Sequence, residues 1–386
     1  MNINFKMPNE YKIKSLIISF LVYATVFPGT IKIYIGTSIG SVFNIVVFIF
    51  LIFSLLFFYS NKNLNKCELS YIIILVSYLF FVLLYSFNGY TDTHISIAKV
   101  VISSLISIML IIYKPNDIAS GFISWCCLFG CVTLIFGLGN LIDKQQVGVN
   151  YLTLTMPVCI IATIFFRRIF INSGYVRKIL YILFTLLSIY YLSISGSRSS
   201  LIIPFAFIFV YTSIFFYKNN RLLFIILVIA MSGSFLSFLD VLKLFLEEKN
   251  SYLYTRLFDA DSLVSNSLER NDIYSLVYEM ILDSPALGHG VNAYKDILNI
   301  EYVESFPLEL VLTFGVFIGA MFIFLIHYPA LLKWKSKYNI QEVFIISVCV
   351  FLFFVKGWSL FDYSIQFIIM SLILIDNGVG SENKNC

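Results

Sequence analysis

The sequence predicts an all-α integral membrane protein, because its composition is strongly apolar and its apolar residues are gathered in long runs. Of the 386 residues, 59% are hydrophobic and only 12% are charged, and the mean hydropathy is +0.89. Soluble domains carry roughly 25% charged residues. We therefore expect one polytopic membrane domain over residues 1–386. The formal charge of +4 does not call for a nucleic-acid partner.

The apolar runs set the expected number of transmembrane helices. A helix needs about 20 apolar residues to cross the hydrocarbon core, and the chain has about twelve such runs, several of them short or interrupted by glycine. The runs cover residues 15–35, 39–58, 69–87, 95–112, 119–140, 151–166, 179–195, 200–217, 222–239, 306–326, 340–355 and 359–375. Most of the loops between them are short, so any chemistry is expected at the membrane surface.

The orientation follows from lysine and arginine, which favour the cytoplasmic side of short loops. These residues gather in the termini and in alternate loops: Lys6, Lys12, Lys14, Lys62, Lys66, Lys114, Arg167, Arg168, Arg177, Lys178, Lys218, Arg221, Lys333, Lys335, Lys337 and Lys384. The opposite short loops carry only Lys32, Lys144, Arg198 and Lys356. Both termini are therefore predicted to be cytoplasmic, and the N-terminal run, which lacks a small-residue cleavage site, is predicted to stay as an anchor.

A short hinge of small residues with one arginine lies between two apolar runs. It reads Ser-Gly-Ser-Arg-Ser-Ser over residues 195–200 and is predicted to lie outside. A cation at the mouth of two spans is costly unless it faces water or an anion, so Arg198 is a functional hypothesis by default.

The longest polar segment covers residues 240–303 and is predicted to lie outside, between the ninth and tenth spans. Val241–Lys249 predicts a short amphipathic helix on the membrane surface. A second helix is predicted to begin with Asn266 as its N-cap and Glu269 at the third helical position, and to end at Asp283–Pro285.

Arg270 in this second helix is placed at a cost. The spacing puts it on the same face as Ile273, Val277 and Ile281, which form the predicted buried stripe. A cation near a helix N-terminus also opposes the helix dipole. These two costs indicate an anionic partner, either a ligand or a nearby acid: Glu269, Asp272 or Asp259.

A glycine-flanked histidine follows the helix. Gly288 and Gly290 favour a tight turn around His289, whose backbone N–H groups could bind a phosphate or carbohydrate oxygen. The alternative is an ordinary surface histidine in a loop.

In this order the motifs resemble the O-antigen ligase and polymerase superfamily of bacterial envelope polysaccharide synthesis. The resemblance is carried by Ser195–Ser199, Glu269–Arg270 with Tyr274, Pro285–Gly290, Phe306–Leu310 and Phe314–Gly319. Ligases of this family carry a His-Asn pair where this chain has Glu304 and Ser305, and the difference favours the polymerase branch.

The resemblance implies an enzyme that works on undecaprenyl-diphosphate-linked glycan at the outer face of a bacterial plasma membrane. A polymerase would transfer the growing glycan onto a new lipid-linked repeat unit. Two alternatives stay open, a ligase that joins finished glycan to another acceptor, and a flippase or transporter of lipid-linked oligosaccharide. A chain-length regulator and a flippase are partners expected from family analogy alone.

Site roles follow from what this reaction needs. Arginine binds phosphate oxygens through a fork of donors that stays charged, so Arg198, Arg270 and Arg256 are the candidates for holding the diphosphate. The base that takes the proton of the acceptor hydroxyl could be Glu269, Glu304 or His289. Further substrate contacts are expected from Ser197, Ser199, Tyr274, Gly288 and Gly290. The resemblance implies no metal and no cofactor.

Overall fold

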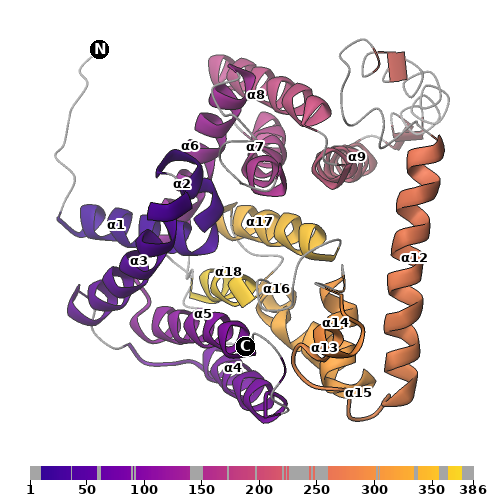
Figure 1. Cartoon of the computed structure of the whole chain (residues 1–386). Helices are drawn as coiled ribbons and strands as arrows, with labels where there is room; N and C mark the ends of the chain where they lie inside the picture. Colours follow the sequence, from indigo (N-terminus) through magenta and orange to yellow (C-terminus); the bar gives the residue numbers. More distant parts are fainter. Residues whose placement is uncertain are drawn as a thin grey trace. The chain divides into compact units, whose positions relative to one another are not determined.

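The computed structural model shows a helical protein, drawn in Figure 1. It describes residues 10–35, 37–58, 62–87, 90, 93–139, 151–171, 174–195, 198–219, 221–222, 224–225, 243–244, 247, 260–300, 303, 305–333, 338–355 and 364–375. Residues 198 and 260–270 are among those described by their backbone alone. Within these ranges every regular element is a helix, which confirms the all-α part of the prediction.

Contacts divide the chain into two compact units. One contains residues 1–125 and 272–386, and the other contains residues 126–271. The boundaries fall inside helices α6 (Ile118–Leu138) and α12 (Ala260–Asp283). One polytopic membrane domain over residues 1–386 stays a prediction, and the two units are described separately below.

The first unit is built around a short central helix. α18 (Ile365–Ile375) is buried from Gln366 onward and contacts α5 (Thr93–Tyr113) and α17 (Tyr338–Val355) most extensively, as Figure 1 shows. A helix that is apolar all round is a core helix. The remaining helices of this unit are α1 (Glu10–Val26), α2 (Pro28–Ile35), α3 (Thr37–Phe58), α4 (Lys66–Leu84), α13 (Ala293–Ile297), α14 (Phe306–Phe314), α15 (Val316–Ile326) and α16 (Tyr328–Lys333).

The second unit contains three consecutive long helices, α7 (Tyr151–Ile171), α8 (Tyr175–Ile194) and α9 (Arg198–Asn219). α7 packs against both α8 and α9 and is the most buried of the three. Small residues allow close packing here, since a Cβ added to Gly137 of α6 would meet the ring of Tyr191 on α8 at 2.4 Å.

In the described part of the chain, five helices are long and apolar enough to cross a membrane by themselves, so this is a multi-pass membrane protein. They are Lys66–Leu84, Ile118–Leu138, Leu154–Ile171, Tyr175–Ile194 and Ser199–Asn219. Six shorter apolar helices accompany them: Ile13–Val26, Ile45–Phe57, Ile97–Tyr113, Val316–Ile326, Ile340–Val355 and Ile365–Ile375. The total of about twelve spans stays a prediction.

Two of the predicted spans are broken helices. The run 15–35 is split between α1 and α2 just before Pro28, because proline has no N–H to donate within a helix. The run 306–326 is split between α14 and α15 at Gly315, which has φ +82° and ψ 167°. The run 222–239, the surface helix Val241–Lys249 and most of the large predicted loop before residue 260 lie outside the continuously described residues.

The polar helix α12 begins earlier than predicted. It starts at Ala260, so Asn266 lies inside the helix and is not its N-cap. The six residues before Asn266 contain neither glycine nor proline, so nothing in them interrupts a helix. The predicted end is confirmed, because α12 stops at Asp283, two residues before Pro285.

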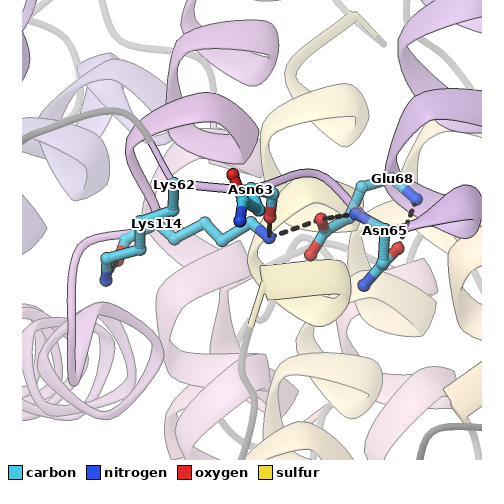
Figure 2. Close-up of polar contacts among 5 residues, drawn as sticks. All are labelled: Lys62, Asn63, Asn65, Glu68 and Lys114. Carbon is cyan, nitrogen blue, oxygen red and sulfur yellow. Dashed lines mark hydrogen bonds and ion pairs between the residues drawn. The ribbon is translucent and has the colours of Figure 1, made fainter.

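A buried ion pair links the first turn of α4 to Lys114, the residue that follows α5 (Figure 2). The Nζ of Lys114 lies 2.5 Å from Oε2 of Glu68, whose side chain is fully buried. The same Nζ donates to the carbonyl of Asn63 at 2.7 Å, while Nζ of Lys62 donates to the carbonyl of Lys114 at 2.6 Å. Partial burial and the charge of Lys114 lower the pKa of Lys62. Asn65 and Glu68 complete a capping box at the start of α4.

Candidate functional site

The turn after α12 is the part of the predicted site that the structure describes in full. It takes positive φ at Gly288 (69°), Gly290 (97°) and Asn292 (62°). Gly288 accepts no side chain, since a Cβ there would lie 2.4 Å from the carbonyl oxygen of Thr313. The sequence prediction of a tight turn around His289 is therefore confirmed.

This turn is hydrogen-bonded to the break between α14 and α15. The backbone N–H groups of His289 and Gly290 donate to the carbonyls of Leu312 (2.9 Å) and Thr313 (3.1 Å) at the end of α14. The N–H of Val316, which opens α15, donates to the carbonyl of Pro285 at 2.8 Å. A break leaves carbonyls at the end of one helix and N–H groups at the start of the next without helical partners, and these three bonds satisfy two such carbonyls of α14 and the first N–H of α15.

The prediction that the turn offers its N–H groups to a ligand is wrong. Gly288 donates to the carbonyl of Ser284 at 2.9 Å, and Val291 donates to the carbonyl of Tyr85 at 3.1 Å. With His289 and Gly290 also bonded, each of the four successive donors serves a protein carbonyl. Two of these donors serve the end of α14 and one serves Tyr85, and a sequence cannot show which distant carbonyls need them.

The ring of His289 is held at the end of α12. Its Nε2 lies 2.5 Å from the carbonyl oxygen of Met280. A carbonyl only accepts, so Nε2 carries the hydrogen, and in the neutral ring Nδ1 is the nitrogen that can take up a proton. His289 is half-buried, so this residue keeps partial access to the surface. The geometry fits a general base and also a helix-capping side chain.

A buried acid lies on α14, one helical turn before the carbonyls that accept the N–H groups of the His289 turn. Glu309 is 1% exposed, and its Oε1 accepts a hydrogen bond from the hydroxyl of Tyr294 at 3.2 Å. Tyr294 belongs to α13 and is itself buried. Sequence reasoning placed Glu309 in a motif without giving it a role. The available signal was an acid inside an apolar run, which marks a functional hypothesis.

The predicted apolar stripe of α12 is confirmed. Val277 and Ile281 are buried, and the half-buried Ile273 packs against the same cluster. The cluster also contains Met280, Ala293, Tyr294, Val303 and Leu312, so it joins α12 to α13 and α14. Tyr274, predicted to contact substrate, is half-buried on the same helix. The stripe therefore fixes the helix end that carries the Met280 carbonyl.

The arginines that are predicted to hold the diphosphate belong to the second unit. Arg198 is the first residue of α9, and Arg270 lies on α12 beside Glu269; the side chains of all three lie outside the described residues. Ser199 is half-buried on α9, while Ser197, Arg256 and Glu304 lie outside the described residues altogether. Of the predicted site residues, the structure thus brings together His289, Gly288 and Gly290.

The surroundings of Arg198 carry no local acid in the sequence. From residue 151 to residue 222 the chain has no Asp or Glu. Around the hinge itself, Ser195 Oγ donates to the carbonyl of Leu192 at 2.8 Å, and Ser200 Oγ donates to Thr155 Oγ1 at 2.5 Å. These bonds tie the end of α8 to itself and the start of α9 to α7.

Residues 183–323 match the family model described as O-antigen ligase. The matched segment, which is less than half of the chain, begins within α8 and ends within α15. It contains the α8–α9 hinge, α12, the His289 turn and the Gly315 break. Comparisons with curated proteins and with solved structures found no match.

The O-antigen ligase match agrees with the resemblance that the motifs carry. Together with the apolar helices it supports a membrane glycan-processing enzyme of the O-antigen ligase and polymerase superfamily. Among the described residues, no three His, Cys, Asp or Glu side chains gather as a metal site would require.

Proposed function

We propose that this protein is a polymerase of oligosaccharide repeat units linked to undecaprenyl diphosphate. It transfers the growing glycan onto a new lipid-linked unit at the outer face of a bacterial plasma membrane. The observation that carries the proposal is the O-antigen ligase match over residues 183–323, a segment in which Glu304 and Ser305 stand where ligases of the family carry His-Asn.

The reaction exchanges one bond to the anomeric carbon for another. The bond from that carbon to the diphosphate oxygen breaks, and a bond to the acceptor hydroxyl oxygen forms. The electron pair of the broken bond leaves with the diphosphate, and the acceptor proton passes to a base. The protein must therefore stabilise negative charge at one place and accept a proton at another.

Arg198 and Arg270 are proposed to hold the leaving diphosphate, with Arg256 as a third contact. Arg198 begins α9 in a stretch without Asp or Glu, so no carboxylate within that stretch competes with a phosphate for its guanidinium. A guanidinium binds two phosphate oxygens at once and remains charged throughout the reaction. The N-terminal end of α9 adds partial positive charge at the same residue.

His289 is proposed as the base through Nδ1. The bond from Nε2 to the Met280 carbonyl fixes the tautomer that leaves Nδ1 as the proton acceptor. Glu269 and Glu304 are the alternative bases, and their side chains are not described.

The test measures the length of surface polysaccharide in cells that carry the wild type, Arg198→Ala or Arg270→Ala at equal expression. For a polymerase, each variant should reduce a long ladder to a single repeat unit on its final acceptor, with a loss of roughly 10²-fold or more in chain extension. Arg177→Ala is the matched control, because Arg177 is exposed in the first turn of α8. An unchanged ladder in both arginine variants contradicts the proposal that these arginines hold the leaving diphosphate.

A ligase is the second candidate, because the matching family model is described as O-antigen ligase. The same gel separates the two functions. Loss of the ladder together with accumulation of long carrier-linked polymer identifies a ligase, whereas reduction of the ladder to a single repeat unit on the final acceptor identifies a polymerase.

A further inference from the structure

We propose that Glu309 and Tyr294 form a buried pair that positions the His289 turn, and that both are positioning residues for glycosyl transfer. The inference rests on the proposed function and adds two residues to its machinery. All the residues concerned belong to the first unit, and each of them is described there.

Burial of the Glu309 carboxylate at its position carries a large desolvation cost. The residue is 1% exposed and lies between Leu308 and Leu310 on α14. Removing a carboxylate from water costs several kcal/mol. Its place in the first turn of α14 offsets part of this cost, because the helix dipole favours an anion there. A well-packed apolar residue would avoid the cost, so packing alone gives no reason for an acid here.

The bond from Tyr294 spans two segments that also meet through their backbones. Tyr294 lies five residues after His289, and Glu309 lies three residues before Leu312, whose carbonyl accepts the N–H of His289. The side-chain bond at 3.2 Å and the backbone bond at 2.9 Å therefore close a ring that contains the turn from His289 onward. One edge of the turn is held by backbone and the other by Tyr294 and Glu309.

The turn transmits this constraint to the histidine ring. The ring is bonded to the carbonyl of Met280, and Met280 belongs to the same buried cluster as Tyr294 and Leu312. A displacement of α13 relative to α14 would move the turn within this cluster and change the position of Nδ1. Small errors in the placement of a catalytic group, about 1 Å, can cost up to roughly 10²-fold in rate.

Direct catalysis by Glu309 does not fit its burial. Only 1% of the residue is exposed, and its surroundings include two buried tyrosines, since Tyr78 of α4 also lies within electrostatic range. A base must come within hydrogen-bond distance of the acceptor hydroxyl. Glu309 therefore acts through the turn.

The test uses the full-length protein in proteoliposomes with lipid-linked repeat units extracted from a strain that lacks this protein. Chain extension is followed at several donor concentrations, so that kcat and KM are obtained separately. Tyr294→Phe and Glu309→Leu should lower kcat about tenfold with KM changed by less than about twofold, while Glu309→Gln, which keeps an acceptor oxygen, should stay within about threefold of the wild type. The double variant Tyr294→Phe/Glu309→Leu should have about the kcat of the less active single variant, because both substitutions remove the same bond.

Tyr71→Phe is the matched control. Tyr71 is equally buried, and its hydroxyl donates to the carbonyl of Ile326 at 3.3 Å, so the change removes a similar buried bond elsewhere in the same unit. This variant should keep its kcat. Thermal melting of each variant shows whether it is folded at the assay temperature.

The outcomes separate the inference from the proposed function. A normal kcat in Tyr294→Phe overturns the positioning role. If Glu309→Gln is as slow as Glu309→Leu, the negative charge and not the bond matters, which also overturns it. A wild type that does not extend lipid-linked chains at all overturns the proposed polymerase, whatever the variants do.

Discussion

Gly315 shows how a single residue decides the shape of the matched segment. Its φ of 82° and ψ of 167° lie in a region that essentially only glycine occupies. A Cβ there would lie 2.3 Å from the carbonyl oxygen of Ala286, so the chain also approaches too closely for any side chain. The break allows α14 to end where the His289 turn can bond to it.

We therefore expect Gly315→Ala to destabilise the protein. The backbone strain alone costs about 1–3 kcal/mol, and the close contact with Ala286 adds to it. Thermal melting in detergent should show a melting temperature lower by several degrees, and the variant should lose activity with it. Gly174→Ser is the control, because Gly174 is an N-cap with φ −76° and its Cβ would be no closer than 3.7 Å to a neighbour. Equal melting of Gly315→Ala and the wild type would contradict the steric argument.

At the scale of elements, side chains from separate helices and loops fix where each helix can lie. The loop before α4 and the loop after α5 are joined by the reciprocal lysine bonds and by the pair of Lys114 with Glu68 (Figure 2). Oε1 of Glu68 is buried and has no hydrogen-bond partner among the described residues, so this carboxylate depends on the contacts of Oε2 with Lys114 Nζ and the N–H of Asn65. The net stabilisation from a buried ion pair is smaller than the loss of stability when one of its two partners is removed.

Removal of the cation alone should therefore be costly. Lys114→Met leaves Glu68 buried without its counter-charge, and breaking a buried pair in this way costs about 3–5 kcal/mol. The double variant Glu68→Gln/Lys114→Met should recover a large part of the lost stability, because it leaves no uncompensated charge. Thermal melting checks both, with the exposed Lys66→Met as control. If the double variant melts below the single one, the ion pair is not the source of the loss.

The whole molecule is a multi-pass membrane protein whose two helical units each have their own buried helix, α18 in one and α7 in the other. The orientation of these units in the membrane remains a prediction from charge. The stretch with no acid between residues 151 and 222 carries Arg167, Arg168, Arg177 and Lys178 near its α7–α8 connection. Cations in short loops of this kind are retained in the cytoplasm.

Topology reporters test this orientation. Alkaline phosphatase fused after residue 197 or after residue 283 should be active, because both positions are predicted to lie outside. The same reporter fused after residue 173, in the α7–α8 connection, should be inactive, and a fluorescent protein that folds only in the cytoplasm should give the opposite pattern. Activity of alkaline phosphatase at residue 173 would reverse the predicted topology and remove the outer-face site.

The helical membrane class, the end of α12, its buried stripe and the tight turn at His289 could all be predicted from the amino-acid sequence. These features depend on composition, on periodicity and on glycine and proline, which act over a few neighbouring residues. The same local character explains the early start of α12, since residues 260–265 contain nothing that stops a helix.

The partners of the polar groups in the site could not be predicted from the sequence and follow from how the helices pack. The N–H groups of the His289 turn bond to carbonyls of Leu312 and Thr313, and the hydroxyl of Tyr294 bonds to Glu309. Each of these bonds joins residues 15 or more positions apart in the chain. Buried polar groups take whichever partner the packed helices bring within reach, and a linear sequence records the groups without recording those distances.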